Sequence, residues 1–251
     1  WLWIFPLVTF GLGCWQVYRL RWKRRLIETL EQRSKEPPVP LSALTDEVGR
    51  PFTLGAPGQP TYAEFTRVTI TGEFLHDQEM YLGPRNRNDA AGVGGGIISN
   101  GAGIGYYVFT PFRLAGSGHT ILVNRGWIPK AARAQRVPGR DDVTGPVTLV
   151  GMTRHGEPSN AFALTNKPQQ NEWFWIEVEA MAAHTGALPV LVEMQRAGMA
   201  LSSPGALMPA SPAPRATEIK VRNTHLEYAI TWFGLFAFST WWITRRPRFH
   251  R

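Results

Sequence analysis

The stretch that decides the fold class is residues 105–128, which read GYYVFTPFRL, AGSG and HTILVNRGWI in succession. Residues 105–114 and 119–128 are rich in β-branched and aromatic side chains, which favour strands. The Ala-Gly-Ser-Gly segment between them contains the glycines that a tight turn needs. We therefore predict an antiparallel β-hairpin in the middle of the chain.

Strand signals continue on both sides of this hairpin. Residues 64–75, EFTRVTITGEFL, alternate polar and apolar side chains, as a half-buried strand does. Further strands are predicted at 79–82, 147–154, 173–177 and 189–194, with a weaker one at 216–222. One helix is predicted over 177–185, because Gly186 supplies a C-terminal stop. The centre of the chain thus predicts a mainly antiparallel β domain with one or two short helices.

The densest apolar runs lie at the two ends of the chain. Residues 1–18, WLWIFPLVTFGLGCWQVY, carry no charge and amount to roughly 27 Å of helix, close to the thickness of a bilayer core. Residues 226–243, LEYAITWFGLFAFSTWWI, carry Glu227 as their only charge. Seven of the ten tryptophans lie in or beside these runs, as in an aromatic belt. We therefore expect a membrane protein in which two transmembrane α-helices flank the β domain.

The expected organisation has five parts. They are transmembrane helix 1 at 1–18, a basic helical extension at 19–35, a β-rich soluble domain at 36–222, transmembrane helix 2 at 223–243 and a basic tail at 244–251. Within the β domain, residues 83–104 and 196–215 are rich in Gly, Asn, Pro or Ser and are expected to be mobile loops. The sequence starts on Trp1 rather than Met, so we interpret it as a processed product from which any targeting segment is missing.

Composition and motifs exclude several classes of function. The net charge is +8, but the basic residues gather beside the apolar ends, at 19–25 and 245–251. This distribution favours anionic lipid head groups and argues against nucleic acid as a partner. The single cysteine, Cys14, excludes an intrachain disulfide and a thiolate metal cage. No P-loop, Rossmann glycine pattern, HExxH, CxxC or GxSxG motif is present, so we expect a protein that is not an enzyme.

Two residues stand out as candidates for a binding site. His225 lies at the start of the second apolar run, where a neutral imidazole can ligate a metal or haem iron. The alternative is an interfacial histidine beside an N-cap formed by Asn223 or Thr224. Arg125, in the segment VNRGWIP, either has a structural role, in a salt bridge or as a turn residue, or holds an anion such as a carboxylate or a haem propionate. The residues alone leave both alternatives open.

Seven segments resemble, in order, the Surf1/Shy1 family. They are GLGCWQVYRLRWK at 11–23, RVTITGEFLHDQEMYLGPR at 67–85, GYYVFTPFRL at 105–114, ILVNRGWIPK at 121–130, VTLVGMTR at 147–154, NEWFWIEVEAMA at 171–182 and RNTHLEYAITWFGL at 222–235. Because the ordered set spans nearly the whole chain, the resemblance covers both ends and the β domain between them.

The resemblance implies an assembly factor for cytochrome c oxidase that acts while the largest oxidase subunit matures, by binding or handing over haem a. The alternative is a purely structural membrane scaffold that stabilises oxidase assembly intermediates without binding haem. The implied partners are the largest oxidase subunit, other assembly factors and the haem a synthesis machinery. The implied location is the mitochondrial inner membrane, as a multi-pass protein with its soluble domain in the intermembrane space.

The resemblance also points to particular site residues. Bacterial relatives have been linked to haem a through the histidine that matches His225, which makes His225 the candidate axial ligand of the haem iron. Tyr228 and Trp232 follow at helical offsets of three and seven, so they share its face and are expected to line an apolar haem wall. Arg125 or Arg222 is expected to pair with the propionates.

Overall fold

The computed structural model describes residues 2–46, 49, 51–54, 62–86, 103–138, 142–157, 164–200 and 224–245. The chain divides into two units. One unit, called here the helical unit, comprises Trp1–Gln32 and Glu218–Arg251. The other, called the β domain, comprises Arg33–Thr217.

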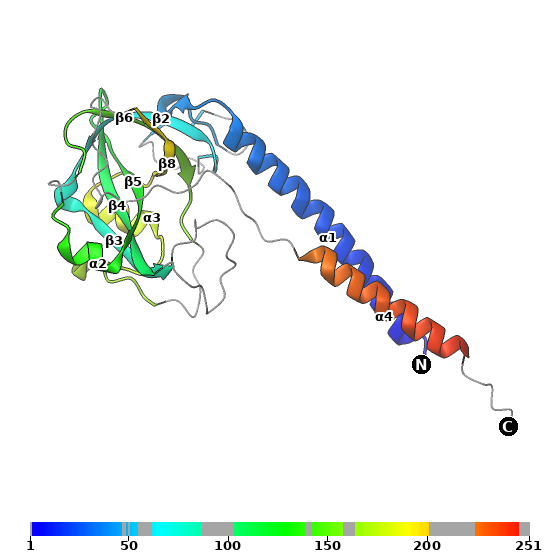
Figure 1. Cartoon of the computed structure of the whole chain (residues 1–251). Coiled ribbons are helices and arrows are strands. Elements are labelled where there is room, and N and C mark those ends of the chain that lie inside the picture. Colours follow the sequence, from blue (N-terminus) through cyan, green and yellow to red (C-terminus); the bar gives the residue numbers. More distant parts are fainter. Residues whose placement is uncertain are drawn as a thin grey trace. The chain divides into compact units, whose positions relative to one another are not determined.

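Two helices form the helical unit, α1 (Ile4–Lys35) and α4 (His225–Arg245), which lie side by side (Figure 1). They run antiparallel, because Gln16 contacts His225 at the start of α4 whereas Phe10, earlier in α1, packs against Phe233 and Phe236 further along α4. The Phe10 ring centroid lies 5.9 Å from that of Phe233 and 5.1 Å from that of Phe236. Aromatic packing therefore joins the two ends of the sequence.

The expectation of two transmembrane helices is wrong. No helix among the described residues combines the length and the apolar character that crossing a bilayer would require. In α1 the uncharged part runs only from Ile4 to Tyr18, roughly 22 Å, before basic residues begin at Arg19. In α4 a charge at Glu227 and several hydroxyl side chains interrupt the apolar run. The sequence interpretation noted Glu227, but it counted tryptophan and tyrosine rings as apolar and gave too little weight to the hydroxyl side chains.

The β domain contains an eight-stranded sheet within the described ranges. Its strands are β1 (Val39–Pro40), β2 (Arg67–Phe74), β3 (Met80–Asn86), β4 (Ile104–Leu114), β5 (Thr120–Pro129), β6 (Val147–Arg154), β7 (Glu172–Trp173) and β8 (Leu191–Ala200). Helices α2 (Lys130–Gln135) and α3 (Val178–Thr185) and the 3-10 turns Leu41–Ala43, His76–Gln78 and Pro168–Gln170 accompany it. The prediction of a mainly β domain with short helices is confirmed.

The sheet closes on itself. The strand order is β1-β2-β6-β8-β5-β4-β3-β7, and β2 also pairs with β4. Strands β2, β6, β8, β5 and β4 therefore form a ring in which each is paired on both sides. Most ladders are antiparallel, but β8 joins β5 in parallel, with Leu191 opposite Leu122. Figure 1 shows these strands wrapped around one another in the β domain.

The predicted hairpin is confirmed as β4 and β5. The two strands are antiparallel, with Arg113 opposite Thr120 at the end next to the turn. Gly116 and Gly118 in the turn have φ values of +86° and +68°. A residue with a Cβ adopts this left-handed region only at a steric cost, so the glycines explain why the chain reverses here.

Other elements agree with the sequence predictions in kind but differ in their bounds. The strand predicted at 173–177 is reduced to the two residues of β7, because the chain turns into α3 soon after. The helix α3 is confirmed, and Gly186 ends it with φ +68°. Strand β8 continues into the first five residues of the loop expected at 196–215. The strand predicted at 216–222 and much of the loop expected at 83–104 lie outside the described residues.

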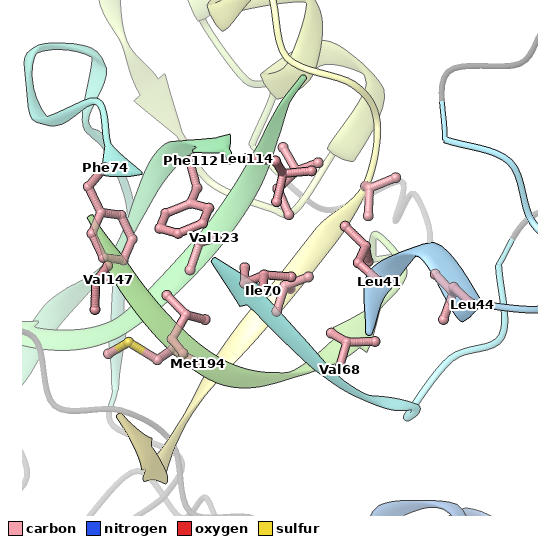
Figure 2. Packing of buried hydrophobic residues seen from close by; sticks show 14 of the residues in the cluster. Leu41, Leu44, Val68, Ile70, Phe74, Phe112, Leu114, Val123, Val147 and Met194 are labelled. Carbon is pink, nitrogen blue, oxygen red and sulfur yellow. The ribbon is translucent and has the colours of Figure 1, made fainter. Parts of the chain in front are cut away.

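The hydrophobic core follows from the alternation seen in the sequence. In β2, Val68, Ile70, Gly72 and Phe74 are buried, while the alternate residues Thr69, Thr71 and Glu73 are less so. Figure 2 shows Val68, Ile70 and Phe74 in one cluster with Phe112 of β4 and Val123 of β5. Burying each such side chain stabilises the fold by about 1.5–3 kcal/mol. The closed ring therefore surrounds its own core.

A second buried cluster lies where α3 packs on the sheet. Met80, Leu82 and Phe109 come from β3 and β4, and Met181 comes from α3. Trp173 of β7 is completely buried in the same cluster. The apolar face of α3 thus packs on β3, β7 and part of the ring.

Candidate functional site

His225 is the first residue of α4, and side chains of α1 surround its imidazole. Its Nδ1 lies 2.8 Å from Oε1 of Gln16, although 209 residues separate the two in sequence. The indole ring of Trp15 meets the imidazole edge-on, with ring centroids 6.5 Å apart. His225 is half-buried and Gln16 is only 9% exposed. The helical unit therefore places a partly shielded imidazole between two helices.

The aromatic residues predicted to share the face of His225 lie on the same helix. The N–H of Tyr228 donates to the carbonyl of Thr224 at 3.3 Å, so helical hydrogen bonding begins just before His225. Tyr228 is 55% exposed and Trp232 is half-buried. The helical spacing of the three residues is as expected, and their role as a haem wall stays a prediction.

The close approach of the two helices depends on Gly13. A Cβ built on Gly13 would lie 2.7 Å from the ring of Phe233, closer than real Cβ contacts come. Gly13 and Gln16 are one turn apart on α1, so the same close approach brings Gln16 to His225. A small residue at position 13 is therefore part of the geometry around the imidazole.

Gly13→Ala is expected to weaken the α1–α4 pairing, whereas Gly11→Ala is its matched control. Both substitutions raise helix propensity by about 1 kcal/mol, but only the one at Gly13 meets a ring, at a typical overpacking cost of about 1–3 kcal/mol. A Cβ at Gly11 has nothing within 4 Å. Thermal unfolding of the helical signal should therefore place the Gly13 variant below the Gly11 variant. Equal midpoints for the two would contradict this packing.

Arg125, the other residue singled out from the sequence, belongs to the β domain and is 2% exposed. Its Nη2 donates to Oδ1 of Asp142 at 2.6 Å and its Nη1 to Oε2 of Glu79 at 3.3 Å. The sequence left open whether Arg125 has a structural role or holds an anion of a ligand. In the structure it forms salt bridges with Asp142 and Glu79. Arg222, the other expected propionate partner, lies outside the described residues.

Arg136 completes a buried ion network with Arg125, Glu79 and Asp142. Its Nε and Nη2 donate to the two oxygens of Glu79 at 2.8 and 2.9 Å, and Nη2 also donates to Asp142 Oδ2 at 2.7 Å. The four charged side chains are at most 2% exposed. The two positive and two negative charges balance, which reduces the high cost of burying them.

The network shifts the pKa values of its members. Burial on its own would raise the pKa of Asp142, but hydrogen bonds and positive charges from Arg125 and Arg136 outweigh it and lower this pKa to about 2. Burial would lower the pKa of Arg136, but the two carboxylates raise it above its ordinary value. Burial and the hydrogen bond to Glu79 raise the pKa of Tyr81. The Asp142 carboxylate and the Arg136 guanidinium are therefore both charged at neutral pH.

Acid is expected to destabilise the β domain through Asp142. Because the pKa of this carboxyl falls from an ordinary 3.8 to about 2 on folding, its stabilisation is complete above about pH 4 and is lost as the pH falls toward 2. The full loss, reached below about pH 2, should amount to about 2–3 kcal/mol in the free energy of unfolding, of which about 1 kcal/mol is lost by pH 3. Urea titrations at pH 7, 5, 4 and 3 measure it. A free energy that stays level or rises down to pH 3 would contradict the network.

The same cluster resembles a metal site but is already occupied by protein cations. Ligand atoms of His76, Glu79 and Asp142 lie within 4.8 Å of one another. Two guanidinium groups donate to both carboxylates, however, so an added divalent cation would meet their positive charge. His76 bonds through Nε2 to the carbonyl of Val143 at 2.9 Å. We interpret the cluster as a structural ion network.

Sequence reasoning missed the partners of both candidate residues. Gln16 is the one side-chain amide in the uncharged run 1–18, and that isolation is the signal that could have found it. Glu79 is 46 residues from Arg125 in sequence, and no local pattern connects them. In both cases the fold, and not the spacing, brings the partners together.

These features define a class of protein with an antiparallel pair of terminal helices, an imidazole held between them and a β domain whose sheet closes on itself. The model of the SURF1 family matches residues 4–237. The chain is 41% identical over 244 residues to the SURF1-like protein of Monosiga brevicollis, covering 96% of this chain and 85% of that protein. The chain belongs to the SURF1 family.

Vertebrate relatives give the same result. The chain is 35% identical over 240 residues to Surfeit locus protein 1 of Homo sapiens, covering 95% of this chain and 73% of that protein. It is also 35% identical over 241 residues to Surfeit locus protein 1 of Xenopus tropicalis, covering 95% of this chain and 72% of that protein. The resemblance to the Surf1/Shy1 family drawn from the seven ordered segments is confirmed.

Proposed function

We propose that this protein acts in the assembly of cytochrome c oxidase, by binding haem a through His225 and handing it over while the largest oxidase subunit matures. Membership of the SURF1 family supports the general theme of oxidase assembly. The observation that carries the haem proposal is the imidazole of His225, half-buried and hydrogen-bonded to Gln16 at the start of α4.

The residues around His225 fit a haem in their chemistry. A neutral imidazole is a common axial ligand of haem iron. When bound, haem a supplies the iron that such an imidazole coordinates and a large apolar ring that needs shielding from water. The ring of Trp15 meets the imidazole edge-on, and Tyr228 and Trp232 follow His225 on α4 at helical offsets of three and seven. Pairing of a propionate with Arg222 stays a prediction, whereas the guanidinium of Arg125 is buried and already ion-paired with Glu79 and Asp142.

The proposed role is to hold and release a cofactor, and it requires no catalytic group. In this proposal the chain would hold the haem through His225 and present it to the largest oxidase subunit. Other assembly factors and the haem a synthesis machinery are proposed as further partners. The partners would be identified by co-purification with the full chain, and failure to recover any oxidase subunit would count against the role.

Titration of haem a into the purified full chain tests this function. The wild type is expected to give a saturable shift of the Soret band, and His225→Ala should weaken binding by more than about tenfold, because the axial ligand is lost. His119→Ala is the matched control, since His119 is an exposed histidine in the β4–β5 turn. Equal affinity in all three proteins would refute His225 as the ligand.

A second function is a scaffold that stabilises assembly intermediates without haem. The observation that favours it is the large exposed apolar surface on the helical unit, where Leu7 and Ile230 are each 66% exposed and Phe238 is 61% exposed. Apolar surfaces of this kind mark interaction sites. If this function holds, Leu7→Ser or Ile230→Ser should reduce co-purification of the largest oxidase subunit, whereas His225→Ala should not.

We also propose that the protein works at the mitochondrial inner membrane, on its intermembrane-space side, with anionic lipid as a partner. The family resemblance supports the location. The basic residues of α1 support the lipid contact, because Arg19, Arg21, Arg24 and Arg25 are all exposed. Subcellular fractionation tests the location, and recovery of the protein outside mitochondria would contradict it.

A further inference from the structure

We propose that Gln16 is a positioning residue for His225, because it fixes which ring nitrogen carries the proton and so which nitrogen can bind a metal. This inference rests on the proposed function and adds a role for α1 to it. The site would then be built from both ends of the chain, with the ligand on α4 and the group that orients it on α1.

The orientation of the Gln16 amide sets the direction of the hydrogen bond between the two residues. The atom of Gln16 that faces the imidazole is Oε1, an amide oxygen, which only accepts hydrogen bonds. At 2.8 Å, Nδ1 of His225 must therefore be the donor and must carry a proton. Gln16 is itself only 9% exposed, so water competes weakly for its oxygen.

The position of this proton determines the coordination chemistry of the ring. A neutral imidazole has one N–H and one lone pair, so a proton on Nδ1 leaves the lone pair on Nε2. Metal-ligating histidines commonly donate their other N–H to an acceptor of the protein, which fixes the ring orientation and raises the basicity of the ligand. Gln16 supplies such an acceptor to His225. Loss of a partner of this kind typically weakens metal affinity by about 10–100-fold.

Packing on α1 makes this arrangement specific to position 16. Trp15 meets the imidazole edge-on, with ring centroids 6.5 Å apart. Gly13, one turn earlier, allows Phe233 to approach α1 closely. The backbone of α1 therefore lies near enough to α4 for the side chain of Gln16 to reach the ring.

Three variants of the full chain separate the effect of the hydrogen bond from the effect of side-chain volume at position 16. Gln16→Met keeps the size of the side chain but has no acceptor for Nδ1–H. Gln16→Glu keeps an acceptor in the same place and is the conservative variant expected to rescue. Gln32→Met makes the same chemical change at an exposed position of α1 and is the matched control. All are compared at pH 8, above the ordinary titration range of an imidazole.

The first readout is the protonation of the imidazole without haem, measured by 15N NMR of histidine-labelled protein. Wild type, Gln16→Glu and Gln32→Met should show His225 protonated at Nδ1, and Gln16→Met should lose this preference. The second readout is the affinity for haem a, which should fall by about 10–100-fold in Gln16→Met alone.

The two readouts distinguish failure of this inference from failure of the proposed function. If the wild type binds no haem a, the proposed function fails and the haem role of Gln16 is overturned with it, whatever the NMR spectrum shows. If the wild type binds haem a but Gln16→Met has the same His225 protonation or the same affinity, the positioning role alone is overturned. The positioning role is supported if Gln16→Met loses both the Nδ1 protonation of His225 and the affinity for haem a, while Gln16→Glu retains both.

Discussion

Replacement of Arg136 by methionine is expected to lower the free energy of unfolding of the β domain by about 3–5 kcal/mol, the usual cost of removing one partner from a buried ion pair. Arg136 donates to both Glu79 and Asp142, and none of its side chain is exposed. Without it, two buried carboxylates share the single guanidinium of Arg125. The residual negative charge in a medium of low polarity is what makes the change so costly.

A urea titration of the full chain measures this effect, with Arg113→Met as the matched control. Arg113 pairs with Glu73 at 3.1 Å, but the two side chains are 52% and 44% exposed. An exposed pair of this kind contributes about 0–1 kcal/mol. If Arg136→Met were no more destabilising than Arg113→Met, the buried network would not be holding the β domain together as described.

Gly72→Ala is expected to have the second large effect, because it blocks the closure of the sheet. Gly72 of β2 pairs with Leu114 of β4, the pairing that completes the ring. A Cβ at this position would lie 2.0 Å from the carbonyl oxygen of Arg113 and 2.8 Å from the ring of Phe112. The first of these is a backbone atom held in the β2–β4 ladder, so it cannot move without breaking the pairing. We expect a loss of about 3 kcal/mol or more in the free energy of unfolding.

Gly103→Ala provides the comparison for this steric effect. A Cβ at Gly103, just before β4, has nothing within 4 Å, so the change should stay within about 0.5 kcal/mol of the wild type. Thermal unfolding of the two variants side by side separates closure of the ring from a general effect of replacing glycine. A Gly72→Ala protein as stable as Gly103→Ala would mean that β2 and β4 do not approach as closely as described.

The parts of the fold that were predictable from sequence are those determined by local patterns. The hairpin of β4 and β5 follows from two β-rich runs and the glycines between them, and α3 follows from an apolar stretch that ends at Gly186. Closure of the ring was not predictable, because the pairing of Gly72 with Leu114 joins strands 42 positions apart and leaves no periodic signal. Sequence periodicity reports which face of a strand is buried, but not which strand lies beside it.

The two ends of the chain show a different limit. Counting uncharged residues led to two predicted spans, although hydroxyl groups, glycines and a nearby basic stretch make α1 and α4 unable to cross a bilayer by themselves. The position of His225 was informative because it begins α4 at the edge of an apolar run. Its partner Gln16 was not found, since the contact depends on how α1 packs against α4.

The ligation of haem a by His225 is tested most directly by chemical rescue. Haem a is added to His225→Gly protein with and without imidazole in solution, and the absorption spectrum is compared with that of the wild type. We predict that the variant alone lacks the wild-type Soret band and that free imidazole restores it. A wild-type spectrum in His225→Gly without imidazole would contradict the claim that His225 is the axial ligand.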